Sequence, residues 1–160
     1  MADLAAEILE ALDDLHGVHD GHRTQHAKGV LLTGAFTAAP EAAALSRAGH
    51  FSGEPTRVTV RFSNGSGDPT NKDGERADGR GMAVKFYLAD GTTSDLIGLT
   101  LPVFFVRTGH DFLEFVRARK PDSETGQMDF GKVGAFLASH PETQAAVEQI
   151  LPSFSAPARI

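Results

Sequence analysis

The first residues of the chain have the apolar period of a helix. Apolar side chains recur at spacings of four, four and three residues, at Leu4, Ile8, Leu12 and Leu15. Acidic residues fill the positions between them, which is the pattern of an amphipathic helix with one buried stripe. The sequence predicts a helix over residues 3–15 that ends before Gly17.

Four later segments have the composition of β-strands. They cover residues 29–37, 56–62, 82–88 and 102–107. In the second, Val58 and Val60 alternate with arginine and threonine, so we expect Arg61 on the face opposite the valines. Residues 64–81 carry glycines, a proline and charges without any period. They predict a long loop, and loops of that length within a domain are usually functional or mobile.

The apolar period becomes helical again towards the end of the chain. We expect a helix around Phe112 and Phe115, and further helices over 129–138 and 142–151, separated by the His140-Pro141 step. Strands followed by helices predict an α+β fold with a largely antiparallel sheet of about four strands. A length of 160 residues, 41% of them hydrophobic, suits a single domain over 1–160.

Composition narrows the classes of partner. Twenty-one acidic against 15 basic residues give a net charge of −6 without a block of lysine and arginine, so we expect no nucleic-acid partner. The chain has no run of 18 apolar residues and no signal-like N-terminus, which predicts a cytoplasmic protein without a membrane segment. The absence of cysteine excludes disulfides, thiolate ligands and a cysteine nucleophile.

Four strings then follow one another in order: Arg23-Thr-Gln-His-Ala-Lys-Gly29, Arg61-Phe-Ser-Asn-Gly-Ser-Gly67, Gly79-Arg-Gly-Met-Ala-Val-Lys-Phe-Tyr87 and Asp95-Leu-Ile-Gly-Leu-Thr-Leu-Pro-Val-Phe-Phe-Val-Arg107. Together they resemble the N-terminal, distal half of the haem catalase superfamily, in its small catalase-related peroxidase branch. The resemblance implies a partial antiparallel catalase-like β-barrel followed by C-terminal helices. It also implies a domain truncated before the region where the family carries its haem-ligating tyrosine.

The resemblance assigns roles to six residues. His26 matches the distal histidine that takes a proton from peroxide and returns it to the departing oxygen, a task that suits an imidazole near neutral pH. Ser63 matches the serine that orients this histidine. The haem b contacts implied by the family fall on two arginines and two aromatic residues: Arg23, Arg61, Phe104 and Phe112.

Two departures from the family pattern change the expected chemistry. Leu99 stands where the family has a distal asparagine, and it cannot donate a hydrogen bond to peroxide, which favours slower peroxidase turnover or an organic hydroperoxide. The single tyrosine, Tyr87, matches a structural position rather than the proximal ligand. The fifth haem ligand would then come from a partner chain or from another histidine, and the candidates are His50, His110 and His140.

Other motifs suggest different chemistry. The spacing of His16, His19, His22 and His26 would line one helix face with imidazoles and could bind a transition metal, although Gly17 and Gly21 weaken such a helix. Gly65-Ser-Gly67 lacks the lysine and the following helix of a phosphate loop, and Ser63 lacks the glycines of a hydrolase elbow.

We therefore predict a haem-dependent, catalase-related peroxidase that acts on hydrogen peroxide or an organic hydroperoxide, as in an oxidative stress response. The alternative is a truncated, catalytically silent fragment. Such a fragment would act as a binding module through its exposed sheet edge, or as half of a split enzyme. The partners expected are a peroxide, a second copy of the chain or a complementary C-terminal chain.

Overall fold

The computed structural model describes residues 3–72 and 79–155. The chain divides into two compact units. The helical unit consists of Met1–Lys28, Asn64–Gly79 and Thr100–Ile160, and the sheet unit consists of Gly29–Ser63 and Arg80–Leu99. Residues 73–78, which belong to the loop predicted over 64–81, lie outside the described residues.

The helical unit begins with α1 (Leu4–His16), which confirms the helix predicted over 3–15. The Asp3 side chain accepts a hydrogen bond from the Ala5 backbone N–H at 3.1 Å and caps the N-terminus. At the other end Gly17 has a φ of 80° and donates to the Asp13 carbonyl. This left-handed conformation explains why glycine ends the helix.

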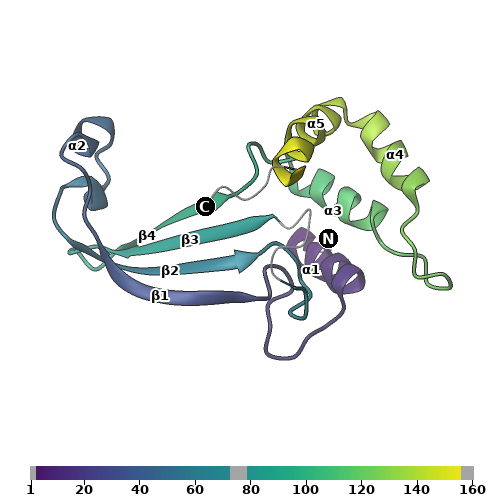
Figure 1. Ribbon diagram of the computed structural model, residues 1–160, viewed down its shortest axis with the longest axis horizontal. Helices are drawn as coiled ribbons and strands as arrows, with labels where there is room; N and C mark the ends of the chain where they lie inside the picture. The colour runs from purple at the N-terminus through teal and green to yellow at the C-terminus, as the bar shows by residue number, and fades with distance from the viewer. Residues whose placement is uncertain (1–2, 73–78, 156–160) are drawn as a thin grey trace. The chain divides into compact units, whose positions relative to one another are not determined.

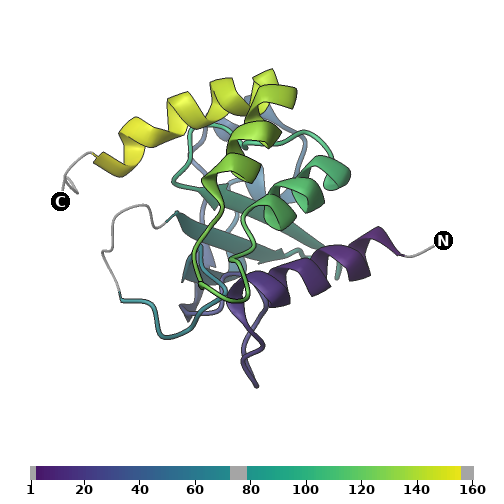
Figure 2. The same cartoon turned by 90° about the vertical axis from the view of Figure 1, so that its right-hand side faces the viewer.

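Helix α3 (Gly109–Ala118) packs against α1, and the two helices lie side by side in Figure 2. Their contact buries Ala11 and Leu12 of α1 against Leu113 and Val116 of α3. A capping box starts α3: Thr108 accepts from the Asp111 N–H, and the Asp111 carboxylate accepts from the Thr108 N–H. The apolar stripes predicted from sequence therefore form the main core of this unit.

Two further helices complete the unit. Helix α4 (Phe130–Ser139) and helix α5 (Pro141–Ser155) confirm the predicted pair, and they separate at the predicted His140-Pro141 step. Phe136 of α4 is buried and lies 5.5 Å from the Phe115 ring of α3. No helix among the described residues is long and apolar enough to cross a membrane.

The sheet unit is one open sheet of four antiparallel strands. The strands are β1 (Gly29–Phe36), β2 (Thr56–Asn64), β3 (Arg80–Tyr87) and β4 (Thr93–Leu99), arranged in the order β1-β2-β3-β4 (Figure 1). The β1–β2 pairing runs from Gly29 opposite Ser63 to Phe36 opposite Thr56. Sheet and helices together confirm the α+β fold.

One predicted strand is wrong. Residues 102–107 form no strand, and the fourth strand is instead β4, which follows β3 through a turn at Gly91 with φ 84°. Pro102 lacks the N–H that a sheet ladder needs. The apolar segment packs through its aromatic rings instead, since the Phe105 ring lies 4.8 Å from that of Phe115.

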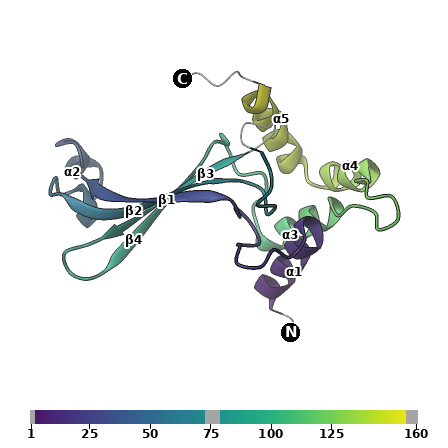
Figure 3. The same ribbon diagram turned by 60° about the horizontal axis from the view of Figure 1, so that its bottom comes forward.

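The apolar residues of the sheet unit cluster where β1 joins β2. Phe86 is buried at 3% exposure, and its ring lies 5.3 Å from Phe36 and 4.2 Å from His50. His50 and Phe51 belong to the short helix η1 (Gly49–Phe51), which follows the single turn α2 (Ala42–Leu45). Figure 3 shows α2 beyond the end of the strands. Neither short helix was predicted from the sequence.

Candidate functional site

The backbone at His26 is the most unusual feature of the candidate site. Its φ is 56°, and it is the one non-glycine among the described residues with a positive φ. A left-handed backbone conformation is unfavourable for a residue with a side chain, and it persists only where surrounding contacts hold it. The side chain is half-buried.

Hydrogen bonds to residues 64–71 hold the segment that contains His26. The Gln25 amide donates to the Gly65 carbonyl, and the Ala27 N–H donates to the Ser66 carbonyl at 3.0 Å. Further along, the Asn64 N–H donates to the Lys28 carbonyl at 3.1 Å. We call residues 24–28 and 64–67 together the clasp. The clasp anchors the chain on both sides of His26.

The clasp leaves no room for a side chain at Gly67. A Cβ at this position would lie 2.2 Å from the Thr24 carbonyl oxygen and 2.8 Å from the His16 ring. Real Cβ atoms essentially never approach other atoms below 3.0 Å. Gly67 is therefore required by close packing of the clasp, not by its backbone angles. Neither Gln25 nor Gly67 was identified from the sequence, because a loop without a period gives no sign of its contacts.

His16 connects the clasp to α1. Burial lowers the pKa of the His16 imidazole, and the positive charge of Arg119 lowers it further. The Gln25 side chain and the Asp68 carboxylate oppose this effect. His16 is thus held towards its neutral form beside the segment that carries His26.

The aromatic residues predicted to contact haem do lie together. The Phe104 and Phe112 rings are 6.3 Å apart at an interplanar angle of 20°, and Phe105 stacks on Phe104 at 4.7 Å. Phe104 is 55% exposed. The predicted haem contact Arg23 belongs to the same helical unit, and it is exposed.

The remaining predicted residues, Arg61 and Ser63, lie in the sheet unit on β2. Ser63 pairs with Gly29 across the β1–β2 ladder. The Arg61 guanidinium packs over Gly29, where a Cβ would lie 2.9 Å from Nη2. The pairing of Ser63 with His26 stays a prediction, as do the haem contacts.

The three histidines considered as proximal ligands have different surroundings. His50 is buried at 7% exposure and stacks on Phe86, and its Nδ1 has no hydrogen-bond partner in the part of the chain described. His110 is exposed on the first turn of α3. Tyr87, the only tyrosine, shares a 3.1 Å hydrogen bond with the Thr59 hydroxyl.

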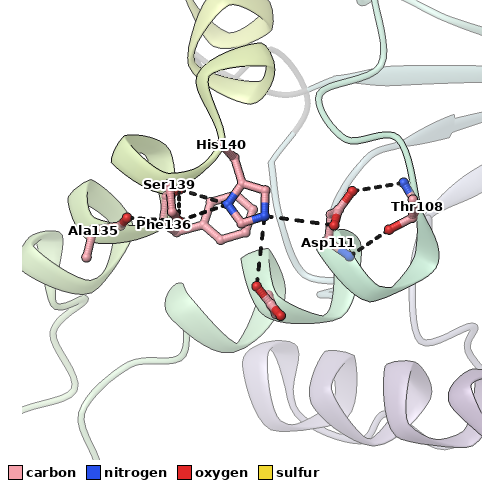
Figure 4. Close-up of polar contacts among 7 residues, drawn as sticks. Thr108, Asp111, Ala135, Phe136, Ser139 and His140 are labelled. Carbon is pink, nitrogen blue, oxygen red and sulfur yellow. Dashed lines mark hydrogen bonds and ion pairs between the residues drawn. The ribbon is translucent and has the colours of Figure 1, made fainter.

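His140 is already engaged between three helices (Figure 4). Its ring stacks on Phe136 at 4.1 Å, and its Nδ1 lies 3.0 Å from the Phe136 carbonyl oxygen. Its Nε2 faces the carboxylates of Asp111 and Glu114 at 3.8 and 3.9 Å. These contacts favour a structural role at the α4–α5 junction over ligation of iron.

The alternative metal site is not supported. Helix α1 ends at His16, so His19, His22 and His26 do not share a helix face with it. Within residues 3–72 and 79–155, no group of three or more histidine and acidic side chains is placed to hold a metal ion.

Comparisons with known proteins agree with this fold. The catalase family model matches residues 8–160. Catalase-related peroxidases of Mycolicibacterium paratuberculosis and Synechococcus elongatus are 37% and 36% identical over 88% and 87% of this chain. The chain spans 44% and 41% of the length of these two relatives.

Solved structures give the same result. Catalase A from Saccharomyces cerevisiae superimposes with a TM-score of 0.67 at 31% identity, over 86% of this chain and 29% of the yeast chain. A bacterial catalase superimposes with a TM-score of 0.64 at 31% identity, over 79% of this chain and 24% of the other. The sequence, the fold and the match over nearly the whole chain together place this protein in the catalase family.

Proposed function

We propose that this chain takes part in a haem-dependent peroxidase reaction on hydrogen peroxide or an organic hydroperoxide, with His26 as the acid and base. The family match over residues 8–160 carries the proposal. The held, left-handed backbone at His26 supports it, because such backbone clusters at functional sites.

Two features of the described residues support haem binding. The rings of Phe104, Phe105 and Phe112 form a stack in which Phe104 is exposed, and a flat macrocycle would pack against such a ring. The exposed guanidinium of Arg23 suits a propionate carboxylate. Haem, when bound, supplies the iron that carries the oxidation.

Residues of this chain would carry out the proton transfer. His26 as a neutral imidazole would accept a proton from the peroxide and return it to the departing oxygen, a role worth a rate factor of about 10² to 10⁴. Ser63 would accept or donate at the other ring nitrogen and so select the tautomer. Arg61 would pair with the second propionate.

Leu99 bears on the choice of substrate. It lies at the end of β4 opposite Gly81 and is 38% exposed. An aliphatic side chain offers peroxide no hydrogen bond but tolerates an alkyl group. We therefore propose an organic hydroperoxide as a better substrate than hydrogen peroxide.

A hemin titration followed by visible absorption tests the proposal, with peroxide consumption measured on the same samples. We expect a saturable Soret change and turnover that falls about 10² to 10⁴-fold in His26→Ala. His22→Ala is the matched control, because His22 is an exposed histidine of the same segment. Hemin binding without turnover, or turnover that His26→Ala leaves intact, contradicts the role of His26. No saturable change favours the silent fragment or the split enzyme.

A further inference from the structure

The residue before the candidate acid–base is built into the clasp. The Gln25 amide donates to the carbonyl of Gly65, while the Ala27 N–H donates to the next carbonyl, that of Ser66. Two successive carbonyls thus accept hydrogen bonds from the residues on either side of His26. The Ala27 bond fixes the peptide plane that follows His26, and the Gln25 side chain ties the residue that precedes His26 to the same loop.

Holding the backbone on both sides of His26 restricts where its side chain points. At a φ of 56° the Cα–Cβ bond leaves the chain in a direction that ordinary backbone does not provide. For a residue with a side chain, the population of this φ region is lower than that of the right-handed region by about tenfold or more. Anchors on both sides of His26 oppose relaxation to the negative φ that residues with a side chain prefer.

The Gln25 side chain also acts on His16 of α1. Its Oε1 is buried and makes no hydrogen bond within the described part of the chain. It lies near enough to the His16 ring to favour the protonated imidazole, although burial dominates there. Gln25 thus acts on both the clasp and α1 through its amide group.

We infer that Gln25 is a positioning residue for His26: its amide donor holds the left-handed backbone that aims the imidazole. This inference rests on the proposed function only in that the orientation of the imidazole matters for proton transfer to and from the peroxide. The geometric part stands on the hydrogen bonds at Gln25 and Ala27 and on the His26 backbone. Gln25 itself need not touch substrate or cofactor.

Gln25→Leu separates positioning from stability, because it keeps the volume of the side chain and removes both the donor and the buried oxygen. We expect the melting temperature to change little, because the variant loses the hydrogen bond to Gly65 but also removes a buried oxygen. The His26 ring Cε1–Hε1 signal should shift in NMR spectra, and exchange of the Ala27 amide should become about tenfold faster. Gln149→Leu, at an exposed glutamine of α5, is the matched control and should leave both unchanged.

With hemin bound, kcat for peroxide should fall about ten- to a hundredfold in Gln25→Leu while KM stays the same. If the wild-type chain shows no turnover, the proposed function fails, yet the His26 signal and the Ala27 exchange still decide the positioning role. Wild-type values of both in Gln25→Leu overturn the inference. If Gln25→Leu does not fold, Gln25→Glu applies the same test, since a carboxylate of the same length cannot donate to the Gly65 carbonyl.

Discussion

Replacing Gly67 with alanine tests the close packing of the clasp. The added Cβ would lie 2.2 Å from the Thr24 carbonyl oxygen, which must retreat by about 0.8 Å to reach the 3.0 Å that real Cβ atoms keep. The His16 ring, at 2.8 Å, must also move. Thr24 precedes Gln25, and the Gln25 side-chain amide donates a hydrogen bond to the Gly65 carbonyl. This bond limits how far the two segments of the clasp can move apart. We expect a loss of about 1–3 kcal/mol in the free energy of unfolding.

Two other glycines of the helical unit provide a graded comparison. A Cβ at Gly109 would meet the flexible ends of Leu4 at 3.1 Å and Ile8 at 3.8 Å, and a Cβ at Gly134 would meet nothing within 4 Å. Gly134 lies inside α4, so Gly134→Ala should stabilise the chain by up to about 1 kcal/mol. Gly109→Ala should fall between the two other variants.

Urea unfolding followed by circular dichroism measures all three variants against the wild type. We expect Gly67→Ala to be the least stable variant and its Ala27 amide to lose protection from exchange. A Gly67→Ala chain within about 0.5 kcal/mol of Gly134→Ala would refute the packing argument. Tight contacts at Gly67 would then be absent in solution.

Three further predictions concern the stability of the chain. Leu113→Ala should cost about 2–5 kcal/mol in urea unfolding, because Leu113 is 4% exposed, whereas Leu45→Ala at 85% exposure should change stability by less than about 0.5 kcal/mol. Thr108→Ala removes the α3 capping box and should lower the melting temperature through a loss of about 1 kcal/mol, with an unchanged result contradicting the cap. Burial and the charge of Arg119 lower the pKa of His16 below its ordinary 6.5, so the unfolded chain binds the proton more readily and stability should fall as pH drops below 6.5. In His16→Gln this fall should be smaller, and identical pH profiles would contradict the direction of the shift.

The elements that the sequence predicted well have a strong local period. Helix α1 lies within one residue of its predicted bounds, because its apolar stripe and its terminal glycine are both local features. Strand β2 likewise follows from its alternation of valine with polar residues. The His140-Pro141 step separates α4 from α5 as predicted, since proline constrains the residue before it.

The fourth strand could not be found by the same means. Both faces of β4 mix polar and apolar residues, so the strand shows no contrast between faces, whereas residues 102–107 are more apolar and look more like a strand. Pairing with β3 through the turn at Gly91 decides the outcome. That preference comes from the hairpin as a whole and not from the strand's own composition.

The family resemblance predicted His26 as the central residue of the candidate site. The structure adds the hydrogen bonds that hold the backbone around His26. Gln25 lies 40 residues before its partner Gly65. Its partner belongs to a loop without hydrophobic period, and no pattern in the sequence links the two. Phe104 and Phe112 were predicted as haem contacts, and that role stays a prediction. The stacking of their rings was not predicted, because it depends on residues 102–107 lying outside the sheet.

Strand β1 has a practical consequence for work with this protein. It is an edge of the sheet, it carries neither charge nor proline from Gly29 to Phe36, and its Val30, Leu31 and Leu32 are 60%, 66% and 52% exposed. The unpaired backbone groups of such an edge can form hydrogen bonds with strands of other molecules. Concentrated samples should therefore lose soluble protein through this strand first. Leu31→Lys or Thr33→Lys would place a charge on this edge, which should reduce aggregation during purification.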